Sequence, residues 1–196
     1  MSEELTQPIP FEEKHLAGCC GLYCGLCPRF QSKAPSRCPS CHLGEHHNYC
    51  SVYRCCVTKR GLHTCAECEE FPCERLLRVL GVEEGVDSFI SYKPTLPNLE
   101  MIREAGLVNF LDQVRQRRIM AEYLIETYNE GRSMSFFCNT CALMPTHLIQ
   151  KAIDEMDADA QLIELDQKAR AKAMKSALMA LASQHGIELK LRRSKK

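Results

Sequence analysis

The chain has 196 residues, of which 45% are apolar and 26% are charged, a balance that permits an ordinary packed core. The length suits one domain, or a small domain with a helical partner. Lys and Arg balance Asp and Glu at 25 each, so the formal net charge is zero and gives no reason to expect a protein that binds nucleic acid or coats acidic membranes.

Residues 1–18 are polar, contain Pro8 and Pro10, and are predicted to form a short lead-in. They lack the apolar segment of a signal peptide. No stretch of the chain approaches the ~18 apolar residues of a membrane helix. We therefore expect a cytoplasmic protein without membrane association, in a compartment where disulfides rarely persist and closely spaced cysteines usually bind metal.

Residues 19–80 are predicted to form a cysteine-rich metal-binding module. Twelve of the 14 cysteines lie between residues 19 and 73, among few large apolar side chains. So small a core rarely offsets an ordering cost of about 1.5 kcal/mol per residue. A structural zinc ion contributes about 10–16 kcal/mol in small peptides, so metal binding and folding of this segment are expected to be coupled.

The cysteines fall into short-spaced groups with the spacing of metal ligands. The ten that define this spacing are Cys20, Cys24, Cys27, Cys38, Cys41, Cys50, Cys55, Cys65, Cys68 and Cys73. A tetrahedral zinc ion with Zn–S bonds of about 2.3 Å requires two such pairs. The most local set of four is Cys38, Cys41, Cys50 and Cys55. The other six exceed one tetrahedral ion, so either two are spare or a sulfur-bridged ion pair or an iron–sulfur cluster is present.

The predicted cofactor is therefore zinc, with two ions expected, and the alternative is an iron–sulfur cluster. Cys27 is followed directly by Pro28, as in ferredoxin-like motifs, which favours the alternative. Histidines near the cysteines can also replace a sulfur, although we interpret them as exposed loop residues: His42, His46, His47 and His63.

The predicted fold is mainly α, with the cysteine-rich module containing little regular structure and a helical domain following it. Residues 81–98 form a turn-rich connector. Apolar residues at three- and four-residue spacing then predict a helical domain over residues 99–186. Its expected helices run from Asn98 to Gly131, from Thr146 onward, and from about residue 160 to Gly186. Residues 187–196 form a basic tail.

Cys138 and Cys141 are possible additional thiols outside the module. If they precede a helix, its N-terminus lowers the pKa of both, giving a reactive dithiol or extra metal ligands. The other interpretation, which we favour, is two buried hydrophobic side chains. The basic tail similarly allows a nucleic-acid contact, but a solvated tail is the preferred interpretation.

The motifs CGLYCGLCP, CPSC, CSVYRC and KRGLHTCAECEEFPCERL occur in this order. Together with LPNLEMIREAG, YNEGRSMSFFC and LMP, they resemble the longer members of the family called domain of unknown function 3795. The resemblance covers about residues 19–150. It implies a metal-binding cysteine-rich domain with the ten ligands named above and no established activity, and it leaves Cys19 and Cys56 as extras.

No phosphate-binding loop, nucleophile elbow or zinc-protease helix occurs, so no catalytic residue is assigned and the chain is not expected to be an enzyme. The predicted function is a structural-zinc module that binds a protein partner or regulates one. An iron–sulfur electron carrier or redox-enzyme subunit is the alternative. A nucleic-acid-binding zinc protein is a lesser one.

Overall fold

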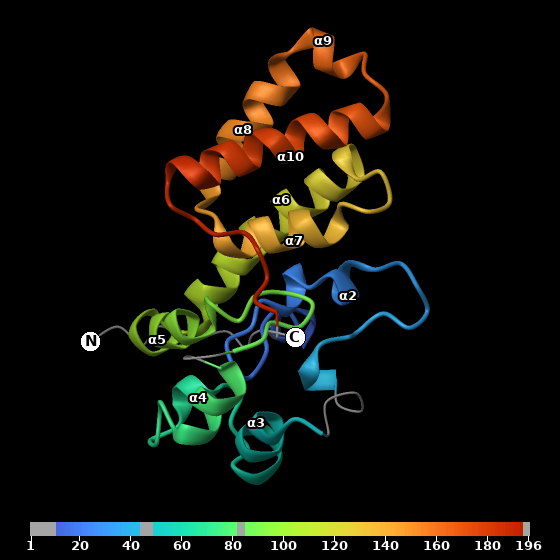
Figure 1. The fold of residues 1–196 in the computed structure, drawn as a ribbon. Helices are drawn as coiled ribbons and strands as arrows, with labels where there is room; N and C mark the ends of the chain where they lie inside the picture. Colours follow the sequence, from blue (N-terminus) through green and yellow to red (C-terminus); the bar gives the residue numbers. More distant parts are fainter. Residues whose placement is uncertain (1–10, 44–48, 82–84, 194–196) are drawn as a thin grey trace, which may run out of the picture.

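The computed structural model describes residues 11–43, 49–81 and 85–193. Within these ranges the chain is mainly helical and contains no β-strand. The predicted helical class is therefore confirmed. Figure 1 shows the helices of residues 107–184 stacked in one half of the molecule and the cysteine-rich chain in the other half, with the helix of residues 95–105 beside it.

The cysteine-rich half consists of short helical turns joined by irregular chain, as predicted. These turns are α1 (Phe11–Lys14), η1 (Cys24–Leu26), α2 (Pro28–Gln31), η2 (Cys41–Leu43), α3 (Ser51–Tyr53), η4 (Arg54–Lys59), η5 (Cys65–Glu67) and α4 (Glu74–Leu80). Several begin or end at a cysteine, so the backbone turns where a thiol is placed. Gly81, at φ 58°, ends α4 in the left-handed conformation that favours glycine.

The helical half contains six helices. They are α5 (Thr95–Ala105), α6 (Leu107–Tyr128), α7 (Met134–Leu143), α8 (Thr146–Ala158), α9 (Ala160–Ile163) and α10 (Gln167–Gln184). The helix predicted from Thr146 is confirmed, and its predicted apolar face, which includes Ile149 and Ala152, is buried. Gly186 follows α10 at φ 65°, as expected of a helix stop.

The single helix predicted from Asn98 to Gly131 is wrong. The chain breaks at Gly106, whose φ of 86° lies outside the helical region, and α5 and α6 are separate. Asn98 does not cap a helix either, because it lies inside α5 and donates to the Gly21 carbonyl at 2.8 Å. Helix α5 begins at Thr95 within the predicted connector, since Pro97 in its first turn needs no amide donor.

Two other boundaries differ from expectation. The helix predicted from residue 160 is divided into α9 and α10, and α10 begins where the Asp166 carboxylate accepts from the Ala169 amide at 2.8 Å. Helix α7 was not predicted. Its sequence, MSFFCNTCAL, is apolar on nearly every side and carries no helical periodicity to detect.

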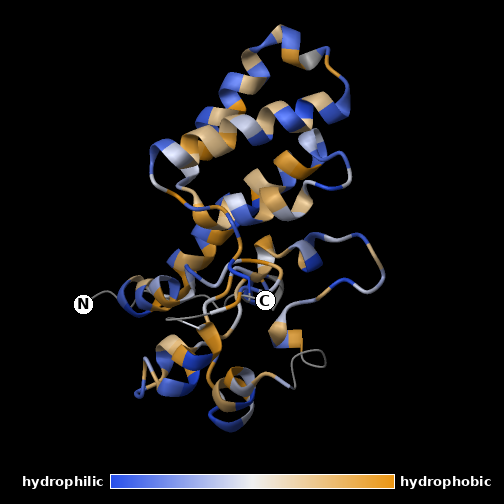
Figure 2. Ribbon diagram, in the orientation of Figure 1, coloured by the Kyte–Doolittle hydropathy of each residue, from blue (hydrophilic) through white to orange (hydrophobic). Residues whose placement is uncertain are grey.

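Helix α6 forms the centre of the core. It packs against α5, α7, α8 and α10, and against η1 of the cysteine-rich half. Tyr23 stacks on Phe110 of α6 with ring centroids 5.6 Å apart, which joins the two halves through a buried aromatic pair. Figure 2 shows mostly hydrophobic positions in α7, and hydrophobic positions alternating with hydrophilic ones along α8 and α10.

The lead-in prediction fails for the described residues 11–18. Leu16 and Ala17 are 3% and 1% exposed, and the Leu16 carbonyl accepts from the Gly25 amide at 2.9 Å, so this segment belongs to the core. Within the described ranges, no helix combines the length and the apolar character that a membrane crossing requires.

Candidate metal centre

Two cavities divide the twelve clustered cysteines between them. The larger, of about 440 Å³, is lined by Cys19, Cys20, Cys24, Cys27, Cys38, Cys41 and Cys50. The smaller, of about 20 Å³, is lined by Cys55, Cys56, Cys65, Cys68 and Cys73. Every cysteine from residue 19 to residue 73 therefore faces one of the two cavities.

This division differs from the predicted one. We expected Cys55 to join Cys38, Cys41 and Cys50, but it lines the smaller cavity instead. Likewise Cys65 was expected beside Cys20, and it lies with Cys55. Three short-spaced groups each stay in one cavity, but the fourth is divided, because Cys50 lines the larger cavity and Cys55 the smaller.

The turn after Cys27 places amide donors around a thiol of the larger cavity. Cys27 precedes α2, with Pro28 at its first position. The backbone N–H groups of Arg29 and Phe30 donate to the Cys27 sulfur and favour its thiolate, although burial, the larger effect, raises its pKa. Such N–H···S contacts are typical of sulfurs that ligate metal.

Gly18 provides space next to two other thiols of this cavity. A Cβ atom at this position would lie 3.3 Å from the Cys24 sulfur and 3.6 Å from the Cys20 sulfur. A methyl group at residue 18 would therefore crowd the Cys24 sulfur and contact the Cys20 sulfur. Burial raises the pKa of Cys20 to about 12.

The smaller cavity is built from η4 and η5. Helix η4 has the wide turn of a π-helix, a feature frequent at functional sites, and carries both Cys55 and Cys56. Thr64 and Glu67 form a reciprocal capping box that holds Cys65 in η5. Arg60 donates to the Cys68 sulfur at 3.5 Å, so a positive charge faces this group of thiols.

Five buried thiols form a continuous row between the cavities. In order they are Cys24, Cys41, Cys19, Cys56 and Cys65, and each side chain hydrogen-bonds to the next. Cys41 and Cys56 accept from the thiols on both sides, which lowers the pKa of each. Hydrogen bonding to these two, followed by burial, raises the pKa of the other three. Cys19 and Cys56, which the family resemblance left as extras, therefore lie at the middle of the row.

Two of the four histidines lie beside this row. The rings of His42 and His63 stack with centroids 4.2 Å apart, and both Nε2 atoms are buried without a hydrogen-bond partner. Burial, the larger effect, and the neighbouring His42 lower the pKa of His63 to about 4. The interpretation as exposed loop residues is therefore wrong for His42 and His63. His46 and His47 lie outside the described residues.

The donor set suits a soft metal ion, because it consists of thiols with N–H and guanidinium donors nearby. Across the described ranges, no group of three or more His, Cys, Asp or Glu side chains surrounds a common ion position. The sulfurs are instead arranged in the hydrogen-bonded row, so the side chains must rotate to surround an ion.

Cys138 and Cys141 do not form a reactive dithiol at a helix start. Both are fully buried, Cys138 near the middle of α7 and Cys141 in its last turn. Burial raises the pKa of Cys138, and it raises the pKa of Cys141 to about 12. Their packing role is the favoured interpretation, and the burial agrees with it.

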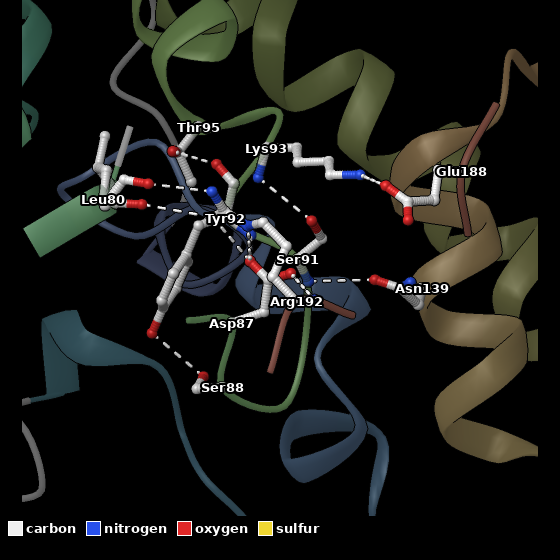
Figure 3. A network of polar contacts seen from close by, with 11 residues as sticks. Leu80, Asp87, Ser88, Ser91, Tyr92, Lys93, Thr95, Asn139, Glu188 and Arg192 are labelled. Carbon is white, nitrogen blue, oxygen red and sulfur yellow. Dashed lines mark hydrogen bonds and ion pairs between the residues drawn. The ribbon is translucent and has the colours of Figure 1, made fainter. Parts of the chain in front are cut away.

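The connector and the C-terminal segment form a polar network beside the larger cavity (Figure 3). Arg192 binds the buried Asp87 carboxylate through its side chain at 2.9 Å and its backbone amide at 2.7 Å. It also donates to the carbonyls of Gly81 and Leu80 at the end of α4. Burial alone would raise the pKa of Asp87, but the bonds from Arg192 and the Tyr92 amide hold it below its usual value. The prediction of a solvated tail is therefore wrong for Arg192, which is bound to Asp87 and to the end of α4.

Asn139 of α7 completes the connection between the segments. Its side chain accepts from the Ser91 amide at 3.1 Å and donates to the Leu189 carbonyl at 2.5 Å. Ser88 and Tyr92 of the same connector line the larger cavity. The C-terminal segment therefore supports one wall of the cysteine-lined cavity, an arrangement that no local motif indicates.

No protein-family model matches the chain, and neither the curated proteins nor the solved structures give a match.

Proposed function

We propose that the cysteine-rich half is a thiolate metal-binding module that holds zinc, and that the protein uses it for interaction with a protein partner or for regulation. The observation that carries this proposal is that all twelve clustered cysteines line two neighbouring cavities. Random burial of thiols as small hydrophobic groups would not gather them in this way. A reducing cytoplasm would keep them available as ligands.

The binding residues are the thiols that line each cavity. Zinc supplies cross-links between turns that have little core of their own, and each thiol releases its proton to solvent when it binds. The Arg29 and Phe30 amides and the Arg60 guanidinium support the resulting negative charge. Sites closed by sulfur ligands leave no position for a reacting water, which argues for a structural role.

A partner surface is available at the rim of the larger cavity. Val79 and Phe89 line this cavity and are 40% and 52% exposed. Large apolar groups that remain exposed beside a rigid site are typical of protein-binding surfaces. Nucleic acid is the less favoured partner, because Arg192 of the basic tail is already paired with Asp87.

An iron–sulfur cluster is the second candidate, and the size of the larger cavity favours it. A volume of about 440 Å³ beside seven cysteines exceeds what one ion needs, whereas the smaller cavity has the volume of roughly one water-sized sphere. Under this candidate the protein carries electrons or serves a redox enzyme.

The test is the metal and acid-labile sulfide content of the full chain purified without oxygen. We expect about two zinc ions per chain, one in each cavity, and no sulfide. Iron with an equal amount of acid-labile sulfide would favour the iron–sulfur cluster over zinc. A chain that folds fully without any bound metal would contradict both.

A further inference from the structure

Hydrogen bonds connect the cysteines of the larger cavity to those of the smaller one. The Cys65 amide donates to the Cys19 carbonyl at 2.8 Å, and the Cys19 amide donates to the Cys41 sulfur at 3.4 Å. These bonds fix Cys19 between a ligand of the larger cavity and one of the smaller. Cys56 is held from the other side, since the Leu62 amide donates to its carbonyl at 3.0 Å.

Cys19 and Cys56 each contact thiols of both cavities. Cys19 lines the larger cavity and interacts with Cys41 there, but also with Cys56 of the smaller. Cys56 interacts with Cys19 and with Cys65 of its own cavity. Both are nearly inaccessible, at 2% and 3% exposure. Among the contacts of the described residues, no other pair of cysteines joins the thiols of one cavity to those of the other.

We infer that Cys19 and Cys56 are bridging thiolate ligands, so that the two cavities hold their metal ions in one sulfur-bridged cluster. This inference rests on the proposed metal-binding function. Cys19 and Cys56, which the sequence motifs leave out, become ligands. The two cavities then form one shared metal site instead of two independent ones.

Distances between ligands in a metal site agree with this inference. Sulfurs that share a tetrahedral zinc ion lie about 3.8 Å apart when the Zn–S bonds are about 2.3 Å. Hydrogen-bonded thiols lie at a similar separation. A row of such contacts can therefore become a row of shared ions through side-chain rotations, without rebuilding the backbone.

Charge favours bridging as well. Two ions that share two thiolates carry half the net negative charge of two separate four-thiolate sites. Charge that is buried without compensation destabilises the folded state. Since Cys19 and Cys56 are both buried, sharing them reduces the charge at the place where solvent stabilises it least.

The test uses the full chain loaded with cadmium-113, which takes the place of zinc in thiolate sites and is visible by NMR. Scalar coupling between two cadmium nuclei passes through a bridging sulfur. We therefore expect coupled cadmium signals in the unmodified protein. Bound cadmium with uncoupled signals would overturn the inference and leave the proposed function standing, whereas a chain that binds no cadmium would overturn both.

Variants identify the bridging residues. The double variant C19S/C56S removes both bridging sulfurs and is expected to abolish the coupling. Each single variant, C19S or C56S, keeps one bridging sulfur and is expected to weaken the coupling. C141S is the matched control, because Cys141 is equally buried but lies in α7. Helix content by circular dichroism checks that each variant folds. If C19S or C56S fails to fold, the coupling in the unmodified protein still decides the inference.

Discussion

Arg192 provides the sharpest test of how the C-terminal segment is held. The R192A variant removes a guanidinium that donates to Asp87 at 2.9 and 3.2 Å and to the Gly81 carbonyl at 3.0 Å. The Asp87 side chain is fully buried, so it would keep its charge without its main partner. Removing one partner of a buried ion pair typically costs about 3–5 kcal/mol.

The expected cost is smaller here for two structural reasons. The Arg192 side chain is 25% exposed, and Asp87 still accepts from the backbone amides of Tyr92 and Arg192. We therefore expect a loss of about 2–3 kcal/mol. In a chain of this length that corresponds to a melting temperature lower by roughly 5–10 °C.

The assay is thermal unfolding followed by circular dichroism, with the same metal in every buffer because bound metal shifts the midpoint. R193A is the matched control, since Arg193 is exposed and has the same charge. A double-mutant cycle with D87N isolates the interaction between Arg192 and Asp87. If R192A lowers the melting temperature no more than R193A does, the C-terminal segment is not held by this ion pair and our reasoning is refuted.

Two further predictions concern the thiols. G18A places a methyl group 3.3 Å from the Cys24 sulfur and 3.6 Å from the Cys20 sulfur, so we expect lower metal content per chain, measured by elemental analysis; full occupancy would show that these sulfurs do not converge on an ion. C138S with C141S should leave metal content unchanged while lowering stability by about 1–3 kcal/mol in urea unfolding, because each buried hydroxyl replaces an apolar contact. Metal loss in that double variant would instead make α7 part of the metal centre.

The sequence predicted the helical half where periodicity was strong and failed where a single residue decided the outcome. The apolar pattern of α8 gave its start and its buried face correctly. The same kind of pattern continues through Gly106, so it could not reveal that this residue takes a positive φ and separates α5 from α6. In α7, residues 137–142 are all buried, which removed the contrast between faces on which such a prediction depends.

The candidate site shows a similar limit. Spacing identified the groups with cysteines two residues apart as local units, since such a pair faces one direction in a tight turn, but it wrongly joined Cys50 to Cys55. It could not determine which groups meet, because that depends on long-range bonds such as the one from the Cys65 amide to the Cys19 carbonyl. Cys19 and Cys56 were left out for the same reason: each is adjacent to a better motif position, and only the fold places them between the cavities.

The C-terminal segment connects the stability of the helical half with the cysteine-lined cavity. Asp87, Ser88 and Tyr92 belong to one connector, and two of these residues line the larger cavity while the third binds Arg192. A ligand that binds in the cavity and orders this wall then stabilises the docked position of the C-terminal segment. Docking of the segment in turn strengthens binding of the ligand by the same free energy. The residues that follow α10 thus support the cysteine-lined cavity, although they lie more than 110 residues after Cys73 in the sequence.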